Sequence, residues 1–166
     1  MRIIAAALAA LVCAGAAAFA QVKTENAQID YAGFVGLTRN VEAYRESRLI
    51  GLAEFQRMAR EPNTIVLDAR SAAAYAAGHI EGAVNLPFTD FTDQSLRAAL
   101  GDPGVRVLIY CNNNFSNDAA PVVLKRVELA LKIQTFINLY GYGYSNVYEL
   151  ADIVDFNDPA VRWVSG

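Results

Sequence analysis

Cys111 is the residue best placed for nucleophilic chemistry. It directly follows Val105–Tyr110, the strongest strand candidate in the chain, and opens the segment Cys-Asn-Asn-Asn-Phe-Ser-Asn at residues 111–117. In open α/β sheets, binding sites form beyond the carboxyl ends of the strands. Successive asparagines tolerate unusual backbone angles, so this loop could direct several N–H groups at one point and stabilise a thiolate or a sulfur species attached to it. The alternative is a buried, inert cysteine that closes a core strand.

Residues 1–20 are predicted to form a secretory signal peptide. Arg2 precedes the apolar run Ile3–Ala18, and Ala18-Phe19-Ala20 is a small-x-small cleavage site. The run is shorter than the roughly 20 residues that cross a bilayer, which argues against a membrane anchor. Cleavage would remove Cys13 and leave Cys111 as the one cysteine of a secreted protein, periplasmic in a Gram-negative source. An unpaired thiol in a compartment that favours disulfides calls for an explanation.

The composition excludes several classes of partner. The chain has 166 residues with 14 Lys and Arg, 17 Asp and Glu, and a formal net charge of -3, so no basic excess points to nucleic acid. The signal peptide holds much of the apolar content, and the remainder has the composition of one ordinary globular domain. We therefore expect no membrane partner after cleavage. The sequence does not indicate the oligomeric state.

Short strands alternate with helical patterns from Arg48 onward, after an N-terminal arm at 21–43 that shows no clear period. This alternation predicts a parallel sheet covered by helices within one domain, residues 44–166. The expected strands are 49–50, 64–67, 83–86, 105–110 and 146–150. The expected helices are 52–60, 72–77 and 93–100, with Ser71 and Thr92 as N-caps of the last two.

Three blocks of the sequence resemble the rhodanese-like domain family. The first is Leu67-Asp68-Ala69-Arg70 with Tyr75 and Gly78–Asn85, the second is Val107–Tyr110 followed by Cys111, and the third is Gly143–Leu150. The resemblance implies an α/β fold with a five-stranded, mostly parallel sheet and helices on both faces. It also implies sulfurtransferase chemistry, in which the Cys111 thiolate takes a sulfane sulfur from a small donor and passes the persulfide sulfur to a thiol acceptor.

The resemblance implies no metal and no organic cofactor, and one His with one Cys is too few for a zinc site. Asp68 and Arg70 end the second strand on the same edge of the sheet as Cys111, where we expect a charge pair or a backbone anchor that supports the site. The persulfide-binding loop would consist of Asn112, Asn113, Asn114, Phe115, Ser116 and Asn117.

The cysteine loop departs from the family pattern in its charge. Asn114 stands where these loops often have glycine, and no residue from 112 to 117 is cationic. Binding of the thiosulfate dianion would depend on backbone N–H groups and on cations from outside the loop, for which Arg70, Lys125 and Arg126 are candidates. This argues against thiosulfate as the natural donor. The lack of a loop arginine also argues against phosphatase activity.

An inserted segment near residues 118–132 follows the loop. Pro121 intervenes, and Val122–Lys132 lengthens the chain before the next apolar stretch. We expect this segment to form a helix or a lid, with Val123, Val127 and Ala130 on one face.

Two functional hypotheses follow. The leading one is an exported sulfurtransferase or persulfide carrier that acts through Cys111. The alternative is a non-catalytic rhodanese-like module that binds a partner protein or a small ligand through the asparagine-rich loop.

Overall fold

The structure is a computed structural model that describes residues 28–165. The predicted signal peptide, its cleavage site and Cys13 lie outside the described residues. A single compact unit begins at Tyr31. Within residues 28–165, no helix combines the length and the apolar character needed to cross a bilayer.

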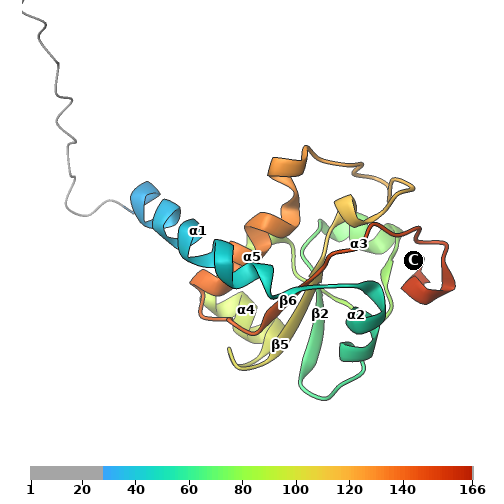
Figure 1. Cartoon of the computed structure of the whole chain (residues 1–166), viewed down its shortest axis with the longest axis horizontal. Coiled ribbons are helices and arrows are strands. Elements are labelled where there is room, and N and C mark those ends of the chain that lie inside the picture. Colours follow the sequence, from blue (N-terminus) through green and yellow to red (C-terminus); the bar gives the residue numbers. More distant parts are fainter. Residues whose placement is uncertain (1–27, 166) are drawn as a thin grey trace, which may run out of the picture. The chain divides into compact units, whose positions relative to one another are not determined.

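A five-stranded parallel sheet forms the centre of this unit (Figure 1). Its spatial order is β1 (Leu49–Ile50), β6 (Val147–Leu150), β5 (Arg106–Tyr110), β2 (Thr64–Asp68) and β4 (Val84–Asn85). The middle strand, β5, pairs with β2 along its whole length, and every neighbouring pair runs parallel. The fold predicted from the sequence is confirmed, and Cys111 directly follows the central strand.

Helices cover both faces of the sheet, as expected for parallel strands. On one face, α1 (Tyr31–Glu46), α4 (Asp93–Leu100) and α5 (Leu131–Gly141) enclose a core that includes Leu67 and Ile109. On the other face, α2 (Leu52–Met58) and Tyr75 of α3 (Ala72–Ala77) pack around Leu108 and Tyr110. Figure 1 shows the two groups of helices on opposite sides of the sheet. Successive residues of β5 therefore face opposite cores.

Both predicted N-caps are formed. The Ser71 hydroxyl accepts a hydrogen bond from the Ala74 N–H at 3.2 Å, and the Thr92 hydroxyl accepts one from the Ser95 N–H at 3.0 Å. Each satisfies a backbone donor at the start of a helix. The cap at Ser71 places α3 directly after Arg70, and so sets the path of the chain away from the end of β2.

The N-terminal arm expected at residues 21–43, for which the sequence shows no clear period, contains a helix in its described part. Helix α1 begins at Tyr31 and continues across the expected boundary at residue 43. Most residues of this helix are exposed, which agrees with a sequence that lacks a wide apolar stripe of helical period. The helix is held by long-range contacts instead: Val41 lies in the core, and Arg45 makes two 2.6 Å hydrogen bonds to the buried carboxylate of Glu149 on β6.

A second, two-stranded sheet was not anticipated. β3 (His79–Ile80) pairs antiparallel with β7 (Trp163–Val164), which follows the short turn Pro159–Val161 near the C-terminus. This pairing brings the Trp163 indole against Gly78, where a Cβ atom would lie 2.7 Å from Trp163 Cε2. Gly78 is therefore required by a close approach between two parts of the chain that are distant in sequence.

Substitution of Gly78 by Ala should destabilise the fold by about 1–3 kcal/mol, because the added methyl group overlaps the Trp163 ring and forces it to shift. Gly104→Ala is the matched control, since a Cβ atom there meets nothing within 4 Å. The free energy of unfolding of the two variants, measured by urea denaturation, checks this prediction. Equal stability of both variants would show that the ring moves aside at little cost.

Candidate functional site

Cys111 lies at the carboxyl edge of the sheet, immediately after β5. Its backbone is extended, with φ -149° and ψ 178°, and only 1% of its surface is exposed. The thiol is free. The ends of β2 and β4, at Asp68 and Asn85, lie along the same edge because the three strands are parallel. The predicted position of the cysteine is confirmed, and its burial is the first constraint on any chemistry there.

The three asparagines after Cys111 form a short 3₁₀ turn, Asn112–Asn114. The N–H groups of Asn114 and Phe115 donate to the carbonyls of Cys111 and Asn112, each at 3.0 Å, and the Ser116 N–H donates to the Val154 carbonyl at 2.9 Å. These three amides are therefore not available to an anion. The asparagines also have no left-handed backbone angles. The expected cradle of N–H groups is wrong for residues 114–116, because main-chain carbonyls take these donors.

The Asn114 side chain holds the loop against β6. Its Oδ1 accepts from the Cys111 N–H at 3.0 Å, and its Nδ2 donates to the carbonyls of Leu150 and Asp152, both at 2.9 Å. All three bonds are made by a side chain that is 2% exposed. A glycine at this position could make none of them, so the departure from the family pattern at Asn114 exchanges backbone freedom for a rigid anchor.

The second half of the loop is structural. Phe115 is fully buried and packs edge-on against Trp163, with ring centroids 4.9 Å apart. Ser116 bonds Val154, and Asn117 bonds residues 155–156 through both ends of its amide. Of the residues proposed from the sequence to bind a persulfide, Phe115, Ser116 and Asn117 thus serve the fold. Asn112 and Asn113 remain as the loop side chains that face the segment beyond.

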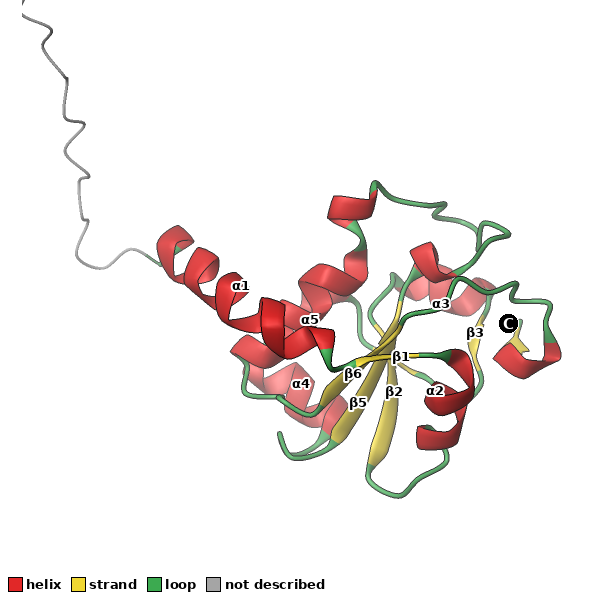
Figure 2. Cartoon of the chain, viewed as in Figure 1, coloured by secondary structure: helices red, strands yellow, loops and turns green. Residues whose placement is uncertain are grey.

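Residues 118–126, here called the strap, lie across this part of the loop. The Asn112 amide donates to the Val122 carbonyl, and the Asn113 amide pairs with the backbone of Lys125, donating to its carbonyl at 2.8 Å and accepting from its N–H at 3.2 Å. The strap is a loop without helix or strand (Figure 2). Only Val127–Leu129 and α5 beyond it are helical. The sequence predicts a helix or a lid here, with Val123, Val127 and Ala130 on one face. The strap is not a helix, and Val123 and Val127 are exposed while Ala130 is buried, so the three do not form a common buried face.

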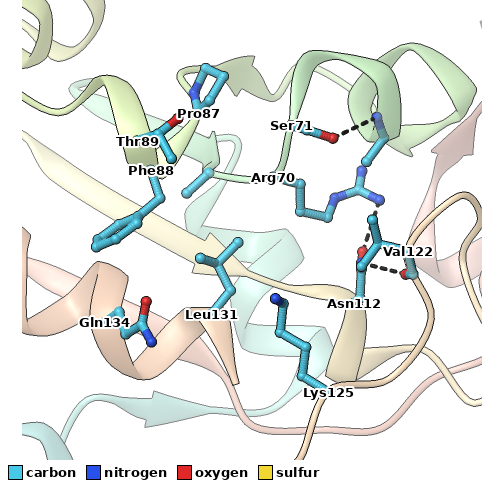
Figure 3. A pocket seen from close by; sticks show the side chains of 12 residues that line it. Arg70, Ser71, Pro87, Phe88, Thr89, Asn112, Val122, Lys125, Leu131 and Gln134 are labelled. Carbon is cyan, nitrogen blue, oxygen red and sulfur yellow. Dashed lines mark hydrogen bonds between the residues drawn. The ribbon is translucent and has the colours of Figure 1, made fainter. Parts of the chain in front are cut away.

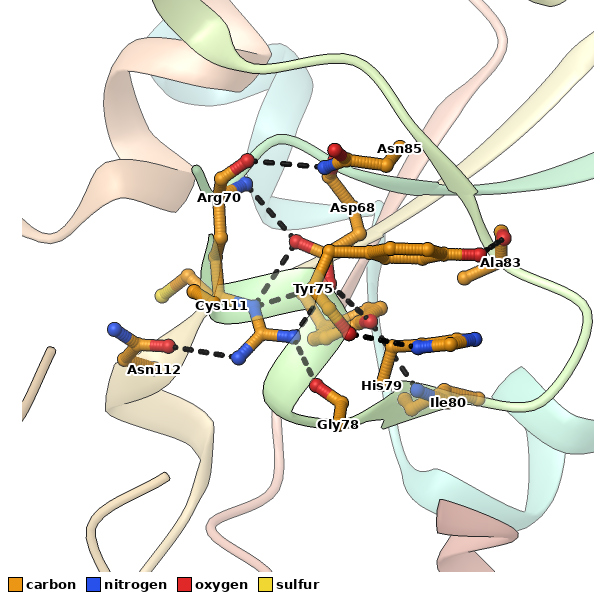
Figure 4. Close-up of polar contacts among 12 residues, drawn as sticks. Asp68, Arg70, Tyr75, Gly78, His79, Ile80, Ala83, Asn85, Cys111 and Asn112 are labelled. Carbon is orange, nitrogen blue, oxygen red and sulfur yellow. Dashed lines mark hydrogen bonds and ion pairs between the residues drawn. The ribbon is translucent and has the colours of Figure 1, made fainter. Parts of the chain in front are cut away.

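Asp68 and Arg70 form the buried ion pair expected from the sequence. The Arg70 guanidinium donates to the Asp68 carboxylate, with Nη2 to Oδ2 at 2.6 Å, and to the Gly78 carbonyl at 2.7 Å (Figure 4). Its Nη1 reaches Asn112 Oδ1 at 3.2 Å, which links the pair to the cysteine loop. The Tyr110 hydroxyl donates to Asp68 at 2.6 Å and accepts from the Ile80 N–H.

Two pKa values are perturbed in this network. Burial, followed by the negative charge of Asp68, raises the pKa of Tyr110 well above its ordinary value. Burial lowers the pKa of Arg70, but the hydrogen bonds and the charge of Asp68 outweigh it, so that the pKa is raised on balance. The phenol therefore stays neutral and the guanidinium charged, and neither group is a proton donor or acceptor near neutral pH.

Comparison with known proteins assigns the family. The family model of the rhodanese-like domain matches residues 51–152. This chain belongs to the rhodanese-like family. It is 24% identical over 125 residues to an adenylyltransferase and sulfurtransferase of Sclerotinia sclerotiorum, a match that covers 72% of this chain and 27% of that protein. The chain thus spans only about a quarter of that relative's length.

Two solved structures are similar to part of this chain. A Bacillus halodurans protein is 21% identical with a TM-score of 0.44, and the match covers 68% of this chain and 76% of that chain. A rhodanese-like domain from Anabaena is 21% identical with a TM-score of 0.39, covering 59% and 82% of the respective chains.

A cavity of about 310 Å³ opens beside the cysteine loop of this rhodanese-like domain (Figure 3). Arg70, Asn112 and Lys125 contribute polar atoms, while Phe88 and Leu131 supply apolar walls. Cys111 itself does not line the cavity; its neighbour Asn112 does. Among residues 28–165, no group of three or more His, Cys, Asp or Glu side chains is arranged to hold a metal ion.

Two groups near the cysteine loop were missed from the sequence. Tyr110 was assigned only to a strand, although its hydroxyl joins Asp68 to Ile80. Lys132 donates to the Leu150 carbonyl at 2.7 Å, the same oxygen that accepts from Asn114, and so places a cation near the loop from α5. The strand pattern of β5 could have indicated which face of the sheet Tyr110 occupies. The position of Lys132 could not be predicted in this way, because it depends on the path of the strap.

Tyr110→Phe should change how stability depends on pH. A raised pKa in the folded state means that the unfolded chain loses the phenolic proton first, so the wild type loses stability as pH rises above the ordinary value of 10.0. The variant should be about 1 kcal/mol less stable at neutral pH, through lost hydrogen bonds, and this gap should narrow above about pH 10. Unfolding free energies from about pH 8 to about pH 11 test this, with the exposed Tyr31→Phe as control. A constant gap would contradict the prediction.

Asn113→Ala should expose Cys111. Two hydrogen bonds of about 1 kcal/mol each hold the strap at Lys125, so their loss should raise the rate of Cys111 alkylation by iodoacetamide roughly thirtyfold. Asn117→Ala is the matched control, because that amide also makes two bonds, but to residues 155–156. Unchanged alkylation of the first variant, or an equal rise in the second, would show that the strap does not cover the thiol.

Proposed function

We propose that this rhodanese-like domain is a sulfurtransferase or persulfide carrier that acts through Cys111. The observation that carries the proposal is the position of the thiol, which follows the central parallel strand at the edge where this architecture forms its sites. Family membership supports it, as does the relative whose name includes sulfurtransferase activity. The neighbouring cavity offers space for a small donor and for an acceptor.

The proposed reaction has two half-reactions. The Cys111 thiolate attacks the outer sulfur of a sulfane donor, a new S–S bond forms, and the donor's own bond to that sulfur breaks, releasing the rest of the donor as an anion. An acceptor thiolate then attacks the outer sulfur of the Cys111 persulfide, and Cys111 leaves as thiolate. Sulfur is transferred without a net oxidant, and the protein returns to its starting state.

The geometry imposes two conditions on this chemistry. Because Cys111 is 1% exposed, part of the surrounding structure has to move before a donor reaches the sulfur, and we propose that the strap, which is bonded to the neighbouring Asn112 and Asn113, is the segment that moves. Because Arg70 is paired with Asp68, it offers little uncompensated charge to a dianion. A donor other than thiosulfate fits this site better. We further propose that the protein acts outside the cytoplasm, where a covered thiol resists adventitious oxidation.

Incubation of the mature protein with a panel of sulfane donors should add the mass of one sulfur atom to Cys111, detected by intact-mass spectrometry and peptide mapping. The added sulfur should leave when a small thiol is supplied, as the second half-reaction requires. Cys111→Ser should neither gain the mass nor transfer sulfur, and it should keep the fold, because serine is close to cysteine in size. If no donor modifies the wild type, or if the serine variant transfers sulfur equally well, the proposal fails.

A second candidate function is binding without turnover, and the burial of the thiol favours it. With the Asn114, Phe115 and Ser116 amides bonded to carbonyls, the loop has few donors left for a reacting anion. In that case the asparagine-rich loop and strap would recognise a partner protein or a small ligand. The mass measurement separates the two, because a binding module acquires no sulfur from any donor.

A further inference from the structure

Two residues of the strap line the cavity, Val122 and Lys125, and Lys125 is the charged one. Figure 3 shows its side chain directed toward the space between Leu131 and Asn112. Among residues 28–165, no hydrogen bond or ion pair engages its ammonium group, whereas its backbone is held at both polar atoms by Asn113. The loop that lacks a cation of its own therefore positions one from twelve residues further along the chain.

The charge of this cavity is unbalanced. Arg70 and Lys125 both line it, and none of the described residues that line it is Asp or Glu, although the protein as a whole is acidic. The Arg70 charge is compensated by the buried carboxylate of Asp68, with Nη2 and Oδ2 2.6 Å apart. The Lys125 ammonium is thus the uncompensated charge in the cavity, and it attracts anions.

The size and walls of the cavity limit the kind of anion. A volume of about 310 Å³, with Pro87, Phe88 and Leu131 among its lining residues, suits an organic molecule with an apolar part. Thr89 and Gln134 add neutral polar groups but no further charge. A small inorganic dianion would face one free cation and leave the apolar walls uncovered.

We propose that Lys125 is a specificity-determining residue, which makes the cavity select small organic sulfur compounds that carry a single carboxylate or sulfonate. Asn113 is its positioning residue. This inference rests on the proposed function for its substrate class. The selection for a negative charge in the cavity beside the cysteine loop does not depend on that function, and it can be measured without sulfur transfer.

Iodoacetate and iodoacetamide provide the probe, because they are similar in size and differ in charge. Each reacts when the Cys111 thiolate displaces iodide and forms a C–S bond. The ratio of the two alkylation rates, divided by the same ratio for the urea-unfolded protein, measures selection for the carboxylate. We expect this normalised ratio to fall roughly three- to fivefold in Lys125→Gln, to return in Lys125→Arg, and to weaken in the wild type at high salt.

Arg126→Gln is the matched control, since Arg126 is the adjacent cation and does not line the cavity. It should leave the ratio unchanged. Asn113→Ala should raise both rates while lowering the ratio, an effect that simple loosening of the loop would not produce. Equal ratios in the wild type and Lys125→Gln, an equal fall in Arg126→Gln, or failure of both reagents to modify Cys111 would each overturn the inference.

The alkylation test of Lys125 and the sulfur-loading test of the proposed function can fail independently of each other. If sulfane donors load Cys111 but the alkylation ratio is insensitive to Lys125, the sulfurtransferase proposal stands and the specificity proposal fails. If the ratio depends on Lys125 but no donor loads the thiol, the cavity selects anions for a binding role instead. With a loaded wild type, 3-mercaptopropionate should be a better acceptor than the neutral 2-mercaptoethanol, and Lys125→Gln should remove that preference.

Discussion

The buried ion pair of Asp68 and Arg70 is the constraint on which the carboxyl edge of the sheet depends. Removing two charges from water is costly unless hydrogen bonds satisfy their remaining polar atoms. Here the Tyr110 hydroxyl, the Gly78 carbonyl and the Asn112 amide complete that set. Each of these partners belongs to a different segment, so the pair fixes the end of β5, the turn after α3 and the first residue of the cysteine loop together. The small sheet of β3 and β7 also reaches this pair, because it brings Trp163 against Gly78 and places the indole ring centroid 5.4 Å from the Arg70 guanidinium carbon.

The cysteine loop obtains its rigidity from side-chain amides. Four asparagine side chains bond groups outside the loop: Asn112 and Asn113 bond the strap, Asn114 bonds the end of β6, and Asn117 bonds Asp155. These bonds connect the loop to its neighbours without further strand pairing. The arrangement leaves Cys111 well positioned and buried, and two of the four amides bind the strap. It also moves the cation from the loop to Lys125, whose backbone Asn113 holds at both polar atoms.

The parts of the fold that could be predicted are those encoded locally. The β-branched run 64–67 and the apolar run 105–110 predict buried parallel strands, and Ser71 and Thr92 predict helix starts, because each signal acts within a few residues. Helix α1 and the β3–β7 pair depend on contacts far along the chain, at Glu149 and Trp163, which local patterns do not reveal. At the site, Cys111, Asp68 and Arg70 were correctly placed. The role of the asparagines was not, because their side-chain bonds to the strap and to β6 follow from tertiary structure rather than from backbone preference.

The strap bonds also set the scale on which the thiol can open. Three hydrogen bonds connect Asn112 and Asn113 to the strap, and at about 1 kcal/mol each they favour the closed form by about 3 kcal/mol. Such a preference leaves the open form populated at about one per cent, which is compatible with turnover after local opening. The exposed Val123 and Leu124 gain little by closing, so the apolar contacts of this part of the strap do not add greatly to this energy, whereas Ala119 at its start is buried in the core. The proposed selection by Lys125 therefore requires that the ligand enters the cavity before the strap lifts, and that the strap opens far enough to free the sulfur while Asn113 still holds the backbone of Lys125.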